Sequence, residues 1–253
     1  AYLQAPRVPV GAVSANRHLF ETASSQLPCV FREHGWPALI SRAMEGHSRT
    51  EKLSASPPLF KSEFLNFFSR VHPAVPAIIF VPVVVAMEWI GVDRGYAAWQ
   101  LALLTLAGGA VWTLTEYWLH RLVFHWEPDN AFGRRMHFII HGVHHDHPND
   151  KMRLVMPPSV SIPLAALFFL GFWAILGNAA FPVFAGFLLG YLFYDYTHYY
   201  VHHFVPKTDF AKRLREHHMR HHFQDHSAGY GVSSPIWDHV FRTYPKQRSK
   251  YRQ

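Results

Sequence analysis

The sequence has almost no cysteine, since Cys29 is the single one among 253 residues. One cysteine excludes an intramolecular disulfide and any zinc site built on a CxxC pair. The first 60 residues lack the apolar stretch of a secretory signal peptide, so we expect none. Lysine and arginine are absent from four long apolar runs, at residues 74–90, 96–119, 159–177 and 179–197.

These four runs predict transmembrane helices. Each has 17 to 24 residues, and about 20 helical residues cross a hydrocarbon layer of about 30 Å. Only Gly177 and Asn178 separate the last two runs, which favours a helical hairpin. The alternative is four buried helices of a soluble core, but such helices are usually shorter and amphipathic. The first run is the least typical, because it contains Pro76, Pro82 and Glu88. We expect an all-α integral membrane protein with four transmembrane helices.

The distribution of basic residues predicts the topology. Of the 24 lysines and arginines, 23 lie before residue 74, within 121–158 or after 197, and only Arg94 lies on the other side. The positive-inside rule places both termini and the 121–158 loop in the cytoplasm. The membrane is the endoplasmic reticulum in a eukaryote or the inner membrane in a bacterium. Anionic headgroups account for the net charge of +7, so no nucleic-acid partner is expected. We expect residues 1–55 to be a partly disordered cytoplasmic tail and residues 245–253 a basic tail.

Fourteen of the 20 histidines gather in four clusters. The second apolar run continues into HRLVFH at 120–125, and the loop contains HFIIHGVHHDH at 137–147. The fourth run continues into HYYVHH at 198–203, and LREHHMRHHF follows at 214–223. All four clusters lie on the predicted cytoplasmic side, so we expect a histidine-rich helical cap there.

Spacing within the clusters predicts shared helix faces. His141 with His145, and His198 with His202, stand four residues apart, so both imidazoles of each pair can reach one point. Adjacent histidines such as His144 and His145 diverge by about 100°, so they suit two different metal ions. Two metal ions with about five nitrogen ligands each fit these clusters, and imidazole accepts iron or zinc.

Three features of the clusters leave alternatives open. His120 and His125 are five residues apart, which requires a helix end or a distorted turn. Taken singly, the clusters also fit a surface loop, an interfacial helix end and a solvated basic helix face. Glu116 and Asp195 each lie one turn before a cluster, where a carboxylate either accepts the outer N–H of a ligating imidazole or caps a helix end.

The boxes HRLVFH, HGVHH, HYYVHH and HMRHH resemble those of the membrane-bound fatty acid hydroxylase superfamily. SPPLFKSEFL at 56–65, EYWLHRLVFH at 116–125 and GYGVSSPIWDHVFRTY at 229–244 resemble its fatty acid 2-hydroxylase branch, so residues 56–244 are the expected hydroxylase domain. The resemblance implies ten metal ligands: His120, His125, His141, His144, His145, His198, His202, His218, His221 and His222. Additional candidates, as alternative ligands or as outer partners of the ligating imidazoles, are His203, His217 and His137. Weaker candidates are His147, His226 and His239, and His18, His34, His47 and His72 lie outside every motif.

The resemblance also implies an activity. It is hydroxylation, with O₂, of the C2 position of a fatty acyl chain in a ceramide, sphingolipid or fatty acid, at a site with two metal ions. Iron is expected for activity, and zinc fits the same ligands. The sequence lacks the HPGG motif of a cytochrome b5 domain, so no bound haem is expected and an external donor of the cytochrome b5 or ferredoxin type supplies electrons.

Other functions remain open at this stage. Related di-metal enzymes that oxygenate sterols, carotenoids or alkanes, and desaturases, share histidine boxes. A membrane metal transporter would place its ligands inside the spans, and a structural zinc protein would not need ten of them. The sequence predicts neither the substrate-binding residues nor the oligomeric state.

Overall fold

The computed structural model describes residues 44–246. The chain divides into two compact units, Ala1–His47 and Ser48–Gln253, and the fold below is that of the second unit. The described residues form helices and no strands, as the sequence predicts. Most of the two predicted tails, residues 1–55 and 245–253, lies outside the described residues.

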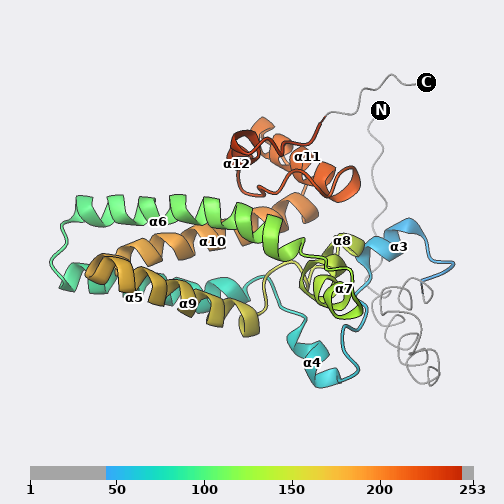
Figure 1. Cartoon of the computed structure of the whole chain (residues 1–253), viewed down its shortest axis with the longest axis horizontal. Coiled ribbons are helices and arrows are strands. Elements are labelled where there is room, and N and C mark those ends of the chain that lie inside the picture. The colour runs from blue at the N-terminus through green and yellow to red at the C-terminus, as the bar shows by residue number, and fades with distance from the viewer. Residues whose placement is uncertain (1–43, 247–253) are drawn as a thin grey trace. The chain divides into compact units, whose positions relative to one another are not determined.

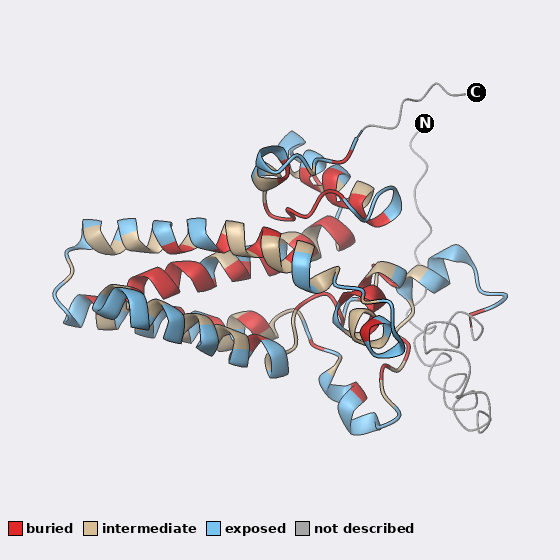
Figure 2. Ribbon diagram, viewed as in Figure 1, coloured by how far each residue is buried: buried red, intermediate tan, exposed pale blue. Residues whose placement is uncertain are grey.

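Four long helices form the bulk of this unit (Figure 1). They are α5 (Val75–Asp93), α6 (Ala98–Leu119), α9 (Pro158–Leu176) and α10 (Ala180–His203). Helix α10 contacts the other three and is buried along most of its length, whereas α5, α6 and α9 expose their outer faces (Figure 2). These outer faces carry large apolar side chains such as Ile78, Trp89 and Ile175, which are 70%, 72% and 81% exposed. Such faces are typical of helices that contact lipid.

Three segments are long and apolar enough to cross a membrane: Val75–Asp93, Ala98–Phe124 and Pro158–His203. The third has 46 residues and contains both α9 and α10. The 3-10 turn η4 (Gly177–Ala179) separates the two helices, and Gly177 has a φ of 55°, a left-handed value that favours glycine. The rings of Phe168 and Phe187 lie 4.7 Å apart and those of Phe169 and Phe184 5.2 Å apart, so the two helices form an antiparallel hairpin.

Close packing of α6 against α10 depends on two glycines. A Cβ atom on Gly108 would lie 1.8 Å from the carbonyl oxygen of Val183, and one on Gly186 would lie 1.8 Å from that of Thr105. Small residues allow membrane helices to approach backbone to backbone in this way. The contact fixes the distance between the two long helices that carry His120, His198 and His202 near their C-terminal ends.

Short helices surround these C-terminal ends. They are α3 (Arg49–Ser54), α4 (Glu63–Phe68), α7 (Ala131–His137), α8 (Val143–Asp146), α11 (Asp209–Phe223) and α12 (Ile236–Val240). Two π-helical turns occur among these elements. The turn η2 (His120–Phe124) continues α6, and η3 (Phe138–Gly142) connects the short helices α7 and α8. The predicted distorted turn between His120 and His125 is confirmed, because the amide of His125 bonds to the carbonyl of His120, 3.2 Å away. Such π turns often occur at functional sites.

Helix α10 is longer than the sequence predicts. We expected the last span to end at residue 197, but the helix continues to His203, so His198 and His202 lie inside it and not after it. The remaining spans begin and end within three residues of their expected boundaries.

Candidate metal centre

Ten histidines converge on two points. The donor nitrogens within each set all lie within 4.8 Å of one another. The first group consists of His120, His125, His141, His145 and His221. The second group consists of His144, His198, His202, His218 and His222. These ten are the candidate ligands of the sequence analysis.

Each group draws its members from distant parts of the chain. The first group combines residues from η2, η3, α8 and α11 with His125, which directly follows η2, and the second combines residues from α8, α10 and α11. His144 and His145 are neighbours on α8 and belong to different groups, as the helical angle between adjacent residues requires. On α11, the adjacent residues His221 and His222 likewise belong to different groups, the first and the second. Adjacent histidines therefore hold the two groups side by side, with ring centroids of His144 and His145 6.0 Å apart.

The spacing between Nε2 atoms suits metal ligation. In the first group, the Nε2 atom of His141 lies 3.1 Å from that of His120 and 3.0 Å from that of His145. In the second group, the corresponding distances are 2.9 Å between His202 and His218 and 3.0 Å between His218 and His222. Two nitrogens bound to one metal ion at about 2.1 Å, and about 90° apart, lie about 3.0 Å from each other.

Hydrogen bonding between imidazoles does not account for this arrangement. Each ring nitrogen carries either one proton or one lone pair, yet the Nε2 atoms of His141, His120 and His125 each have two neighbouring imidazole nitrogens within 3.3 Å. At most one contact of each nitrogen can be a hydrogen bond. A cation shared by all five nitrogens satisfies every lone pair at once, so the donor set fits a metal ion.

Burial keeps these imidazoles neutral, the form that binds metal. Burial and neighbouring histidines lower the pKa of His125 and of His144 to about 3. Burial lowers the pKa of His221 to about 4, and it holds the pKa of His141 and of His218 well below the ordinary value.

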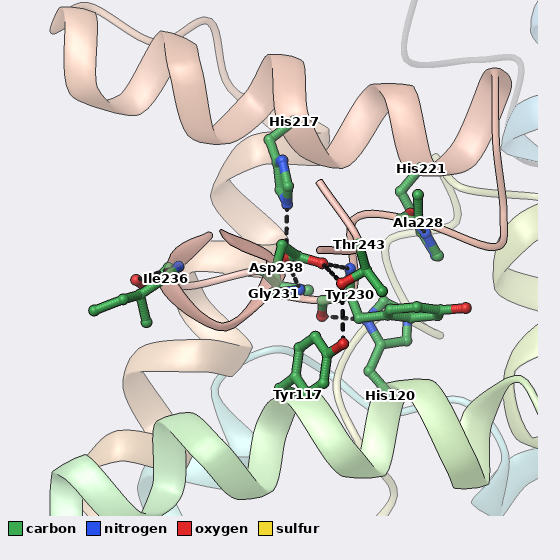
Figure 3. A network of polar contacts seen from close by, with 12 residues as sticks. Tyr117, His120, His217, His221, Ala228, Tyr230, Gly231, Ile236, Asp238 and Thr243 are labelled. Atoms are coloured by element: carbon green, nitrogen blue, oxygen red, sulfur yellow. Dashed lines mark hydrogen bonds and ion pairs between the residues drawn. The ribbon is translucent and has the colours of Figure 1, made fainter. Parts of the chain in front are cut away.

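A loop that the sequence analysis did not link to the histidines orients two of them. The Nδ1 atom of His120 donates to the carbonyl of Tyr230 at 2.7 Å, and that of His221 donates to the carbonyl of Ala228 at 2.7 Å. We call residues 228–243, which include α12, the 228–243 loop. Asp238 of α12 accepts hydrogen bonds from the amides of Tyr230 and Gly231 and so holds the first part of this loop in place (Figure 3). In the sequence nearly all of this loop lies within the motif GYGVSSPIWDHVFRTY, which contains Asp238. The family resemblance included the motif but assigned no role to its aspartate.

The two candidate carboxylates lie near the groups but contact no imidazole nitrogen in the part of the chain that the structure describes. Glu116 accepts hydrogen bonds from the amides of Val232 and Ser233, at 2.7 and 2.8 Å, and from the Ser233 hydroxyl. Glu116 therefore reaches His120 through the 228–243 loop, and the direct bond to an imidazole, which was one of the two roles considered for it, is not formed with any described histidine. Asp195 is buried one turn before His198 on α10, and no residue between 44 and 246 forms a hydrogen bond with the Nδ1 atom of His198.

The three additional candidates lie outside both groups. His217 is buried and donates from Nε2 to Asp238 at 3.0 Å. His137 lies on α7, with its Nδ1 atom 3.8 Å from a carboxylate oxygen of Glu127. His203 ends α10, and its ring lies against that of Tyr199.

Two of the weaker candidates also have other contacts. His147 donates from Nδ1 to the carbonyl of Lys52, and the ring of His239 stacks on Tyr244. The third, His226, lies beside the first group, with its ring centroid 4.8 Å from that of His145.

A cavity of about 430 Å³ adjoins the histidines. Three imidazoles, those of His141, His144 and His198, form part of its wall. Most of the remaining wall is apolar and comes from the segment before α5, the end of η2, η3 with the start of α8, and the segment that leads into α9. These apolar residues are Leu59, Phe60, Leu65, Phe68, Phe124, Ile139, Ile140, Val143, Leu154, Val155, Met156, Pro157 and Val160. A volume of this size with an apolar lining and few polar groups is typical of a small-molecule site.

Comparisons with known proteins agree with this geometry. The family model described as fatty acid hydroxylase matches residues 105–243. Dihydroceramide fatty acyl 2-hydroxylase FAH2 of Arabidopsis thaliana is 39% identical over 195 residues, which cover 75% of this chain and 80% of that protein. Fatty acid 2-hydroxylase of Homo sapiens is 36% identical over 214 residues, 75% of this chain and 57% of that protein.

A solved structure described as full-length scs7p, with only the hydroxylase domain visible, is similar in fold. It superposes with a TM-score of 0.68 at 37% identity, over 72% of this chain and 69% of that chain. The family resemblance inferred from the histidine boxes and from the three flanking motifs is therefore confirmed.

Proposed function

This chain belongs to the fatty acid hydroxylase family, and we propose that it uses O₂ to hydroxylate C2 of a fatty acyl chain. The acyl chain is carried by a ceramide, another sphingolipid or a free fatty acid. The observation that carries the proposal is the pair of five-imidazole groups at the wall of an apolar cavity. Relatives that match three quarters of the chain are named 2-hydroxylases of fatty acids or of dihydroceramide fatty acyl chains, which supports the position of attack.

Each histidine group is proposed to hold one metal ion. The ten neutral imidazoles supply five nitrogen donors to each ion, and iron and zinc both accept such ligands. Iron is the metal proposed for activity, because iron held by these imidazoles would supply the redox chemistry with O₂ that an unactivated C–H bond requires, whereas zinc has no redox chemistry.

The cavity positions the acyl chain. Its apolar wall replaces water around the methylene groups, and the imidazoles of His141, His144 and His198 mark the end at which a carbon atom meets the metal centre. The same imidazoles orient that carbon by their fixed place in the wall, since all three are buried.

The position of the histidines along the helices favours attack near the polar end of the lipid. His120 follows α6 directly, and His198 lies in the last two turns of α10. A helix rises about 1.5 Å per residue, so both lie close to the ends of apolar segments. A lipid whose headgroup remains at the membrane boundary would present its first few carbons there.

Membrane topology and electron supply complete the proposal. We infer that α5, α6, α9 and α10 each cross the bilayer and that the histidines face the cytoplasm, because 23 of 24 basic residues lie on that side of the apolar runs. We propose that an electron donor of the cytochrome b5 or ferredoxin type supplies the electrons.

Lipid mass spectrometry tests this function. Cells that express the chain should accumulate acyl lipids with one added oxygen atom, and cells that express His144→Ala should not, although the protein inserts equally well. Oxidised sterols, carotenoids or alkanes, or acyl chains with a new double bond, would point to a related di-metal reaction. Unchanged lipids together with metal transport into vesicles would reject the enzyme.

A further inference from the structure

The outer nitrogens of the two histidine groups are held differently. In the first group, Nδ1 of His120 and Nδ1 of His221 each donate to a backbone carbonyl of the 228–243 loop at 2.7 Å. A third member of the first group, His145, has no hydrogen-bond partner at Nδ1 within the described residues. In the second group no member has such a bond to a carbonyl in the described part of the chain, and Nδ1 has no partner there in three members: His198, His218 and His222. The structure therefore orients two rings of the first group by backbone contacts that those three rings of the second group lack.

A carbonyl oxygen only accepts hydrogen bonds, so the Nδ1 atoms of His120 and His221 must carry protons. In a neutral imidazole the other ring nitrogen then keeps its lone pair. The Nε2 atoms of both residues face the centre of the first group, where they lie 3.3 Å and 3.0 Å from Nε2 of His125. Two ligands of the first group are thus fixed in the tautomer that binds metal.

Asp238 holds the loop that supplies these carbonyls. One carboxylate oxygen accepts from the amide of Tyr230 at 2.9 Å and from the hydroxyl of Thr243 at 2.8 Å. The other accepts from the amide of Gly231 at 2.8 Å and from Nε2 of His217 at 3.0 Å. Asp238 is completely buried. Figure 3 shows it between His217 of α11 and the Tyr230–Gly231 part of the loop, with Tyr117 of α6 on the other side of Thr243.

Further contacts connect the 228–243 loop to α6, which leads to His120, and to α11, which contains His221. The hydroxyls of Tyr117 and Thr243 lie 2.9 Å apart, and Glu116 accepts from the amides of Val232 and Ser233. Tyr117 and Glu116 lie on α6, which leads directly to His120, whereas His217 lies on α11 one turn before His221. Any movement of the Asp238 carboxylate therefore moves the carbonyls that orient both rings.

We infer that Asp238 is a positioning residue, which preorganises the first histidine group for its metal ion, whereas none of residues 44–246 does the same for the second group. The inference rests on the proposed function only in that both groups bind metal. Its consequence is two unequal metal sites, with the tighter one in the first group. Loss of an outer partner of a metal-ligating imidazole typically lowers metal affinity by about 10- to 100-fold.

The test is a zinc titration of the whole metal-depleted chain in lipid nanodiscs, in competition with a chromophoric chelator. The wild-type protein should bind two zinc ions in two unequal steps. His125→Ala should abolish the tighter step, and His202→Ala should abolish the weaker one, which assigns each step to a group.

Asp238→Asn is the decisive variant. The amide nitrogen of asparagine replaces one carboxylate oxygen, so it cannot accept from the backbone amide that this oxygen bonds, that of Gly231 or that of Tyr230. The tighter step should therefore weaken by about 10- to 100-fold, and the weaker step should stay within about two-fold. Thr243→Val removes one bond to Asp238 and should weaken the same step less, which gives a second comparison if Asp238→Asn does not fold. Glu216→Gln, an exposed change on α11, should leave both steps unchanged.

Two equal steps in the wild type, or an equal loss of both steps in Asp238→Asn and Thr243→Val, would overturn the inference while the metal centre stands. Unaltered zinc binding in both variants would overturn it as well. A wild-type chain that binds no zinc would contradict the metal centre, and the inference with it.

Discussion

The contact between α6 and α10 leaves no room for a methyl group at Gly108. An alanine Cβ at this position would lie 1.8 Å from the carbonyl oxygen of Val183 and 2.8 Å from the amide nitrogen of Phe187. Carbon and oxygen atoms in close contact are normally about 3.3 Å apart. Gly108→Ala must therefore move the two helices apart by about 1.5 Å, because the obstacle is backbone and not a flexible side chain.

Two effects of opposite sign decide the stability of this variant. Replacing glycine by alanine within a helix stabilises it by about 1 kcal/mol, whereas overpacking typically costs about 1 to 3 kcal/mol and sometimes more. Since the clash is with backbone, we take the upper end and expect a net loss of about 2 kcal/mol. For a domain of this size that corresponds to a fall in Tm of roughly 4 to 8 °C.

The displacement should also reach the metal centre. Helix α6 leads to His120 and α10 carries His198 and His202, so a change in their separation moves members of both histidine groups. A misplacement of about 1 Å at a catalytic site can cost about 100-fold in rate. We expect Gly108→Ala to lose bound metal and most hydroxylation activity together.

Two other glycines within the long helices, Gly109 on α6 and Gly171 on α9, provide matched controls. A Cβ on Gly109 would meet only the carbonyl of Gly186 at 3.6 Å, an ordinary contact, and one on Gly171 would meet nothing within 4 Å. Both alanine variants should be as stable as the wild type or slightly more so, by thermal unfolding monitored by size-exclusion chromatography in detergent. The packing argument fails if Gly108→Ala matches Gly109→Ala in Tm, metal content and product.

Three further predictions concern the metal centre. His144→Ala should lose metal by elemental analysis and all activity, whereas His47→Ala, outside every motif, should retain both; full metal content in His144→Ala would contradict its assignment. Because burial lowers the pKa of His221 to about 4, from about 6.5 in an unfolded chain, the unfolded state binds more protons between these values. The Tm of the metal-free protein should therefore fall as pH decreases from 6.5 to 4, and a flat profile would argue against burial of neutral imidazoles. Removal of iron with a chelator should abolish activity, iron(II) should restore it and zinc should not; restoration by zinc would exclude a redox role.

The histidines that share a helix face could be predicted because that information is local, whereas the full set of ten followed from the family resemblance. A spacing of four residues places His141 with His145, and His198 with His202, on one helix face whatever the rest of the chain does. The angle between adjacent residues likewise separates His144 from His145. The apolar runs are just as local, and each of the four corresponds to a long helix of the structure.

The parts that could not be predicted depend on contacts between distant segments. Asp238 approaches His217 across 21 residues and Glu116 approaches Ser233 across 117, and no spacing rule relates such positions. For the same reason the sequence could offer for Glu116 only local roles, a bond to an imidazole one turn away or a helix cap, whereas it accepts from two amides of the 228–243 loop. His217 was a candidate ligand by sequence proximity alone, but its ring faces Asp238.

The most direct test of the central claim is the position at which oxygen enters the lipid. The purified chain, loaded with iron and supplied with a cytochrome b5 or ferredoxin and its reductase, is incubated with a ceramide or a fatty acid under ¹⁸O₂, and fragmentation mass spectrometry locates the label. Attack near the polar end of the lipid predicts one ¹⁸O atom at C2. Label at C3, in mid-chain or at the terminal methyl, or a double bond without label, would contradict the 2-hydroxylase function.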